Sequence, residues 1–375
     1  MQIKPFKLER YFAKYEFAAK YLLSSSDCEP LMMAELLDYA ADEQRALWDG
    51  LWLGYTESQG HPLLLETIAG LYDNINASDV IEVVPEEGIL IAMNTLLQAG
   101  DHVVMSYPAY QSLYQVAESI GCTVSHWMPN PDGWKFDVEQ LTAMVQPQTK
   151  LIVVNFPHNP TGATLTPEEF ARVVDLARQN DCFLFSDEMY RWSEHDEADR
   201  LPAACEVYEN AVSLCGLSKS FALPGLRVGW LATQNDDFMQ RFVNFKDYTT
   251  ICGSAPSEIL ALIALNAKDA IIERTLAIVR DNLSVLDSFF AQHSESFAWS
   301  RPNAGTITLV ELKRNIAIDD FVEKLVSEKG VMMVPASQFE YDGNYFRLGF
   351  GRRNLPEALE HLDDFLANAG VDGLE

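Results

Sequence analysis

Positively charged residues are scarce in this sequence. Its 27 lysines and arginines face 55 aspartates and glutamates, which gives a formal net charge of -28 at pH 7. A surface with this charge repels the phosphates of nucleic acids and the anionic headgroups of membranes. We therefore expect neither nucleic acid nor a membrane among the partners.

Long hydrophobic runs and paired cysteines are also missing. No stretch of about 18 apolar residues appears, so we expect no transmembrane helix. The opening, MQIKPFKLERYF, lacks the apolar core of a secretory signal. The six cysteines are scattered without a C-x-x-C pair, which predicts free thiols in a reducing compartment. These absences together predict a cytoplasmic protein without a bound metal.

The sequence is rich in apolar residues, which make up 48% of its 375 residues. This length suggests two domains. From about residue 80, β-rich runs alternate with helical runs. Strands are predicted at 80–84, 102–108, 123–128, 150–157, 182–190 and 211–217, and helices at 88–98, 110–120 and 167–180. Such alternation is typical of a sheet covered by helices on both faces. We predict an α/β fold, a three-layer αβα domain with a mainly parallel sheet.

The pattern changes after residue 250. A long helical region, 255–298, precedes further strand and helix patterns, which indicates an α+β arrangement. We therefore predict a large ligand-binding domain over 46–254. A smaller α+β domain would combine 255–375 with an N-terminal arm, 1–45.

Polar residues follow several of the predicted strands. In open α/β sheets, ligands bind at the carboxyl ends of the strands. The residues at these ends are Gly88, Tyr110, Asn159, Asp187, Tyr190, Ser218 and Lys219. They come from separate loops, and we expect them to converge on one edge of the sheet.

Lys219 lies in SLCGLSKSFALPGLRVGW, between a strand and a tight turn. Lysine is among the residues least often fully buried. Desolvation would lower its pKa and make the neutral amine a nucleophile that condenses with an aldehyde. An ordinary ion pair with Asp187 is the alternative, and spacing alone favours it.

Two loops carry further candidates. NFPHNPTGATL places Asn159 in a rigid loop, where its amide can donate and accept hydrogen bonds, although a plain turn has the same signals. In SDEMY, Asp187 follows an apolar strand, and a buried carboxylate needs a cationic partner such as a protonated pyridine nitrogen. Tyr190 can offer its phenol to the same ligand. A helix N-cap aspartate is the alternative.

Three positions suit a phosphate and a flat ring. PEEGILIAM opens a helix after a strand, so backbone N–H groups near Gly88 can meet a phosphate. Arg227 supplies a cation for the same phosphate, or else a surface ion pair. Tyr110 can stack on a heteroaromatic ring, or else pack in the core.

Taken together, these motifs resemble the class I/II aminotransferases, fold type I enzymes that use pyridoxal 5′-phosphate. NPTG, SDEMY and SKSFALPGLRVGW occur in the family's order, and the likeness runs from Tyr55 to Arg347. The resemblance implies that Lys219 holds the cofactor as a Schiff base and shuttles the proton between Cα and C4′. It implies that Asp187 keeps the pyridine nitrogen protonated.

The resemblance also assigns the rest of the cofactor site. Asn159 and Tyr190 would hydrogen-bond the ring 3′-oxygen, and Tyr110 would stack on the ring. The phosphate would be held by Ser218, Arg227 and the backbone amides of Gly88 and Ile89.

Two more positions follow from the resemblance. GYTESQG matches the segment whose tyrosine reaches the phosphate of the neighbouring subunit, so Tyr55 implies a homodimer with composite active sites. Arg347, in YFRLGFG, matches the arginine that binds the substrate α-carboxylate, assisted by Asn159. Arg352 and Arg353 lie nearby and leave this choice open.

The chain departs from the family in two places. Many relatives carry Ser or Thr three residues before the lysine, where this chain has Gly216. LLSSSD replaces the glycine-containing substrate loop, and we expect Ser26 to bind the substrate. The opening also loosely resembles that of enzymes handling arginine-derived amino acids. Among the acids of the arm, which include Glu29, we hypothesise that Glu16 or Asp27 reads a cationic substrate side chain; solvated surface acids are the alternative.

These residues predict an aminotransferase that transfers the amino group of an L-amino acid to a 2-oxo acid. Because the cofactor activates every bond at Cα, a C–S lyase, a decarboxylase or an amino-acid cyclase or oxidase on the same fold is the first alternative. A non-catalytic regulatory member of the family is the second.

Overall fold

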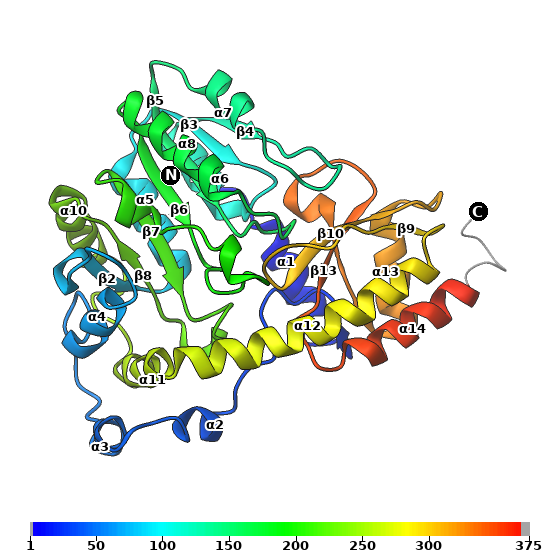
Figure 1. Cartoon of the computed structure of the whole chain (residues 1–375), viewed down its shortest axis with the longest axis horizontal. Helices are drawn as coiled ribbons and strands as arrows, with labels where there is room; N and C mark the ends of the chain where they lie inside the picture. Colours follow the sequence, from blue (N-terminus) through cyan, green and yellow to red (C-terminus); the bar gives the residue numbers. More distant parts are fainter. Residues whose placement is uncertain (1–2, 369–375) are drawn as a thin grey trace.

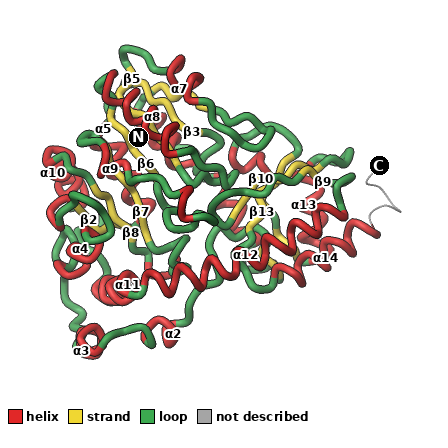
Figure 2. Tube along the Cα trace, viewed as in Figure 1, coloured by secondary structure: helices red, strands yellow, loops and turns green. Residues whose placement is uncertain are grey.

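The computed structural model describes residues 3–368. Figure 1 shows a large sheet surrounded by helices, and a smaller unit with its own sheet. The long helix α12 (Lys268–Gln292) runs between the two. In Figure 2 the strands form two separate groups, and loops fill much of the space between them.

The large sheet has seven strands in the order β2-β8-β7-β6-β5-β3-β4. Neighbours from β7 to β4 pair in parallel, whereas β8 runs antiparallel to both β7 and β2. The strands are β2 (Val80–Val83), β3 (His102–Ser106), β4 (Thr123–Trp127), β5 (Thr149–Asn155), β6 (Phe183–Asp187), β7 (Ala211–Gly216) and β8 (Gly229–Ala232).

Helices cover both faces of this sheet because the strands are apolar on both sides. Val103 and Val153 pack with α5, α6 and α10, whereas their neighbours Val104 and Val154 pack on the opposite face with α7 and α8. A third cluster joins α4 and α11 to the β2–β8 edge. These helices are α4 (Pro62–Ala69), α5 (Pro85–Leu96), α6 (Gln111–Ile120), α7 (Val138–Met144), α8 (Pro167–Gln179), α9 (Ala204–Val207), α10 (Asp236–Lys246) and α11 (Ala255–Asn266).

The smaller unit is built on an antiparallel sheet in the order β12-β13-β10-β9. Its apolar core lies between this sheet and the helices α12, α13 and α14. The elements are β9 (Phe297–Ala298), β10 (Ile307–Leu312), α13 (Ile318–Lys329), β11 (Val331–Met332), β12 (Val334–Pro335), β13 (Tyr345–Gly349) and α14 (Leu355–Asn368).

The N-terminal arm contacts both units. Helix α1 (Lys7–Tyr15) lies between α6 and the segment after β12, and β1 (Tyr21–Leu22) pairs in parallel with β11. Helices α2 (Met33–Leu37) and α3 (Asp42–Asp49) pack along α11. The arm therefore reaches the space between the two sheets.

The predicted three-layer α/β fold with a second α+β unit is confirmed. The helical region predicted as one stretch, 255–298, is instead two helices, because the backbone leaves the helical conformation at Ala267. The proposed domain limits, 46–254 against 1–45 with 255–375, stay predictions.

Among the described residues, no helix is long and apolar enough to cross a membrane. Within the same range, no group of three or more His, Cys, Asp or Glu side chains is arranged to hold a metal ion.

Candidate functional site

A cavity of about 690 Å³ lies where the carboxyl ends of β5, β6 and β7 face the smaller unit. It is lined by ten of the predicted site residues, which are Ser26, Ile89, Tyr110, Asn159, Asp187, Tyr190, Ser218, Lys219, Arg227 and Arg347. The expected convergence of separate loops therefore occurs. Gly88 and Tyr55 do not line it.

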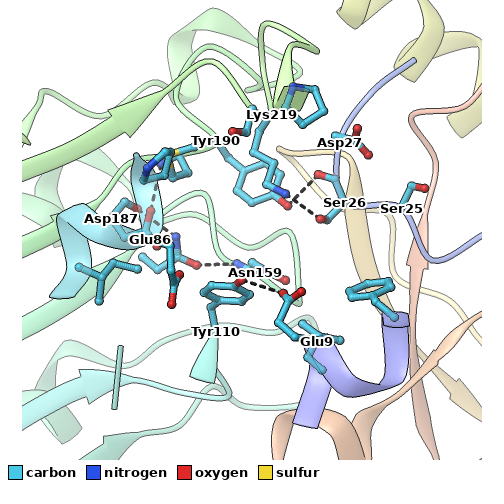
Figure 3. A pocket seen from close by; sticks show the side chains of 18 of the residues that line it. Glu9, Ser25, Ser26, Asp27, Glu86, Tyr110, Asn159, Asp187, Tyr190 and Lys219 are labelled. Atoms are coloured by element: carbon cyan, nitrogen blue, oxygen red, sulfur yellow. Dashed lines mark hydrogen bonds between the residues drawn. The ribbon is translucent and has the colours of Figure 1, made fainter. Parts of the chain in front are cut away.

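Lys219 follows β7 and extends its amine into this cavity (Figure 3). Its Nζ donates to the Ser26 hydroxyl at 2.8 Å. Burial lowers the pKa of the lysine, while the carboxylate of Asp27 acts in the opposite direction. The amine is thus easier to deprotonate than an ordinary lysine, as a nucleophile or base requires. No ion pair joins it to Asp187, the alternative that spacing favoured.

Asp187 ends β6 and is only 6% exposed. Its Oδ1 accepts the backbone N–H of Met189 at 3.2 Å, and burial raises the pKa of the carboxyl to about 7. A buried carboxylate in this state gains from a cationic partner. The cavity side of Asp187 is where such a partner would bind.

Asn155 is a site residue that the sequence reasoning missed. Its Nδ2 donates to the carbonyl of Asp187 at 2.9 Å, and its Oδ1 accepts the backbone N–H of Asn159 at 2.8 Å. The sequence pattern predicts a strand that continues to Pro157, which places Asn155 inside the strand. In the structure β5 ends at Asn155. The rule that polar residues gather at strand ends would have found it.

Arg347, on β13, is 1% exposed. Its Nη1 donates to Asn159 Oδ1 at 3.2 Å and its Nη2 to the Ser24 carbonyl at 2.9 Å, while its buried Nε has no partner in the described residues. Arg352 instead forms an ion pair with Asp27 at 3.0 Å, and Arg353 is exposed. Of the three arginines, Arg347 and Arg352 line the cavity, and Arg347 is the one with a buried donor that lacks a partner in the described residues.

One end of the cavity offers groups suited to an anion. The buried Ser218 hydroxyl has no hydrogen-bond partner within the described chain, and exposed Arg227 lines the same cavity. The Gly88 amide does not fit this role, because it donates to the Val84 carbonyl at 2.9 Å inside α5. The N–H groups that precede the first intrahelical bond belong to Glu86 and Glu87.

The glycines near this end are explained by packing. A Cβ on Gly88 would lie 2.9 Å from Val83 Cγ2, and one on Gly216 would lie 3.0 Å from the Gly229 Cα. The departure at Gly216, where relatives carry Ser or Thr, therefore coincides with close contact between β7 and β8.

Helix α1 covers the cavity, which the sequence did not reveal. Tyr110, the predicted stacking ring, donates its hydroxyl to Glu9 Oε1 of α1 at 2.8 Å (Figure 3). Phe12 and Glu16 of the same segment also line the cavity. An amphipathic helix gives no sign of whether its apolar face covers a core or a ligand.

Acidic side chains are numerous on this wall. Glu9, Glu16, Asp27 and Glu86 all line the cavity, whereas Glu29 does not. Burial raises the pKa of Glu16, and the charges of Asp27 and Glu9 act in the same direction. Burial raises the pKa of Glu86 to about 7. Because like charges disfavour one another, these acidic side chains favour a positively charged group on the ligand.

Tyr55 lies on the outer surface, 87% exposed. A second cavity of about 340 Å³ shares Arg227 with the main one and is also lined by Thr250 and Ser254. Apolar side chains near Tyr55 in the sequence are exposed too, Trp52 at 80% and Leu53 at 79%. Such a group of exposed large apolar side chains is unusual on a surface that contacts only solvent.

Comparison with known proteins gives a consistent picture. A family model described as aminotransferase class I and II matches residues 20–362. The chain is 31% identical over 283 residues to capreomycidine synthase of Streptomyces vinaceus, which covers 75% of this chain and 72% of that protein. It is 28% identical over 329 residues to valine–pyruvate aminotransferase of Mycobacterium tuberculosis, covering 84% of both.

Two solved structures are similar over nearly the whole chain. A PLP-dependent aminotransferase from Streptococcus suis has a TM-score of 0.92 at 29% identity, covering 98% of this chain and 99% of that one. The PLP-dependent cyclase OrfR has a TM-score of 0.90 at 28% identity, covering 98% of both.

Proposed function

Because this chain belongs to the class I and II aminotransferase family, a fold type I group that uses pyridoxal 5′-phosphate, we propose that it transfers the amino group of an L-amino acid to a 2-oxo acid. One observation carries the proposal. The amine of Lys219, the buried guanidinium of Arg347 and the carboxyl of Asp187 line the same cavity.

The residues present fit the cofactor. The buried Ser218 hydroxyl lacks a protein partner and Arg227 lines the same cavity, so both suit the phosphate. Asp187 suits a protonated ring nitrogen, Asn159 and Tyr190 suit the ring oxygen, and Lys219 is the attachment point. When bound, pyridoxal 5′-phosphate withdraws electrons from the substrate Cα and acidifies its bonds.

The chain's own side chains then perform three tasks. Arg347 binds the substrate α-carboxylate, and its unpartnered Nε provides a donor for that contact. Lys219 Nζ accepts the Cα proton and later returns a proton, which its lowered pKa favours. Helix α1 covers the cavity and excludes water.

The proposal is tested by the visible absorption spectrum of the purified protein, recorded with single amino acids and no oxo acid. We expect a yellow cofactor band that a donor amino acid converts to the pyridoxamine form. A protein that stays colourless with added pyridoxal 5′-phosphate would refute the enzymatic proposal.

A cyclase or lyase on the same cofactor is the second candidate, since one structural neighbour is the PLP-dependent cyclase OrfR. The same spectra separate the two. A cyclase, lyase or decarboxylase converts the amino acid to another product and releases water, ammonia or carbon dioxide according to its reaction. None of these reactions leaves the cofactor in the pyridoxamine form.

We further propose that the substrate side chain is cationic. The four cations that line the cavity are Lys219, Arg227, Arg347 and Arg352. The first three serve the cofactor and the α-carboxylate in this proposal, and Arg352 is paired with Asp27. Glu16 has no ion pair among the described residues, so it is better suited than Asp27 to bind the cationic side chain of the substrate.

Glu16→Gln is expected to lower kcat/KM for the preferred cationic amino acid by about 10-fold, since one charged contact is lost. Leucine, which has no side-chain charge, should change little. Glu29→Gln is the matched control, because Glu29 lies on the same arm outside the cavity. If arginine and lysine do not react, or react equally with Glu16→Gln, the cationic assignment is wrong.

We also propose a homodimer whose sites are completed across the interface. The exposed apolar segment around Tyr55 supports this, as does the second cavity beside Arg227, which has room for a partner's side chain. Tyr55 of one subunit would reach the phosphate end of the other.

The mass in solution tests the dimer. Light scattering is expected to give twice the chain mass of 42.1 kDa. Trp52→Glu combined with Leu53→Glu places charges in the interface, so the protein should become monomeric and lose most of its activity. A wild-type monomer with full activity would contradict the composite site.

A further inference from the structure

The Ser26 side chain lines the cavity and contacts the amine of Lys219. Its Oγ is 2.8 Å from Lys219 Nζ, and Figure 3 shows both Lys219 and Tyr190 pointing toward Ser26. The sequence predicted that Ser26 binds the substrate. In the structure its hydroxyl contacts the lysine.

Ser26 is held in place by both units of the fold. Its carbonyl accepts the Tyr190 hydroxyl from the large unit and the Thr306 hydroxyl from the smaller one, each at 2.9 Å. The backbone two residues before Ser26 is also held in place, because Arg347 Nη2 donates a hydrogen bond to the Ser24 carbonyl. A hydroxyl on such a fixed backbone has little freedom to move.

Close packing against β13 adds to this rigidity. A Cβ on Gly349 would lie 1.9 Å from the Ser25 carbonyl oxygen, so only glycine allows the two backbones to approach this closely. The Gly349 N–H donates to the Leu23 carbonyl at 2.7 Å, and the Glu29 N–H donates to the Gly351 carbonyl at 2.8 Å. Residues 23–29 are therefore bound on both sides of Ser26, to the end of β13 and to Gly351 just after it.

We propose that Ser26 is a positioning residue for Lys219, whose hydroxyl holds the amine in line with the substrate Cα during proton transfer. This inference rests on the proposed function. The expectation that Ser26 binds the substrate stays a separate prediction.

The physical argument concerns the freedom of a lysine side chain. Its flexible stem allows the amine many positions, and proton transfer needs the reacting atoms about 3 Å apart. The charged groups around Lys219 include Asp27, Glu9, Arg347 and Arg227, together with Asp187 and Glu16. Within the described residues none of these groups forms a hydrogen bond or ion pair with Nζ, and the Tyr190 ring centroid is 6.0 Å away, so the hydroxyl of Ser26 is the hydrogen-bond partner that fixes the direction of the amine.

Ser26→Ala is expected to lower kcat by about 10- to 100-fold, the loss typical of a hydrogen bond to a charged group. KM should stay within about twofold, and the isotope effect with α-deuterated substrate should increase, because proton transfer becomes slower relative to other steps. Ser26→Thr keeps a hydroxyl and should recover most of the rate. Ser24→Ala is the control, since the Ser24 hydroxyl is buried, unpartnered and outside the cavity.

A second measurement does not depend on amino transfer. The cofactor-free chain captures pyridoxal 5′-phosphate through the neutral amine, so the capture rate rises with pH as Lys219 loses its proton. The Ser26 oxygen accepts from the ammonium and stabilises it, so Ser26→Ala should shift this profile to lower pH by about half to one unit. Ser24→Ala should leave the profile in place.

The outcomes separate the possible roles. A raised KM with unchanged kcat and isotope effect would assign Ser26 to substrate binding. Unchanged rates with an unchanged capture profile would leave Ser26 without a role. Either result would overturn the proposal. If the wild type transfers no amino group but the capture profile still shifts, the proposed function fails and the contact between Ser26 and Lys219 stands.

Discussion

Lys219→Ala should lower turnover by on the order of 10⁴-fold or more, the largest effect expected of any single substitution here. The variant loses both the attachment point of the cofactor and the group that moves the Cα proton. Its absorption spectrum should lack the band of the attached cofactor, and stopped-flow mixing with the donor amino acid should show no conversion within the wild-type reaction time.

The fold should survive this change. Burial disfavours the charged amine, so its removal costs little stability, and circular dichroism should match the wild type. Lys150→Ala is the control, because Lys150 lies over the Phe183 ring on the large sheet, away from the cavity. A Lys219→Ala protein that keeps turnover above about one-hundredth of the wild type would remove the lysine from the mechanism.

Arg347→Ala is expected to lower kcat/KM by about 10²- to 10³-fold, which corresponds to the loss of a buried charge-assisted pair with the substrate carboxylate. Most of the loss should appear in KM, because the carboxylate is bound in both the ground state and the transition state. Arg347→Lys keeps the charge but not the two parallel donors, so it should recover only part of the affinity.

Steady-state kinetics with Arg353→Ala provide the control for this arginine. Arg353 is exposed and does not line the cavity, so its removal should leave kcat/KM close to the wild type. If Arg353→Ala is as damaging as Arg347→Ala, the carboxylate binds elsewhere.

The sequence was sufficient to predict every strand of the large sheet except β8, and ten of the residues that line the cavity. Asp187 and Lys219 follow apolar strands directly, and the carboxyl ends of parallel strands meet at one edge. Their position is therefore a local consequence of strand pattern. Arg347 could be chosen only by resemblance, because its distance from Lys219 depends on how two separately folded units pack.

Other parts of the site depend on contacts between segments far apart in the chain. The cover formed by α1, the bond between Glu9 and Tyr110, and the contact of Ser26 with Lys219 join residues more than a hundred positions apart. Periodicity does not specify such pairs. The Gly88 amide was misassigned because the helix begins at Pro85, three residues earlier than predicted, so that amide is already bonded inside the helix.

The division of the cavity between two sheets has a consequence for the chain as a whole. Lys219 and Arg227 belong to the large unit, whereas Arg347 and Arg352 belong to the smaller one, and all four line one space. Arg352 is paired with Asp27, so the arginines without an ion pair in the described chain that line this space are Arg227 from the large unit and Arg347 from the smaller one. A ligand with a phosphate for Arg227 and a carboxylate for Arg347 would contact both units at once. Its binding energy is then linked to the association of the two units, and the heat resistance of the protein rises with ligand concentration.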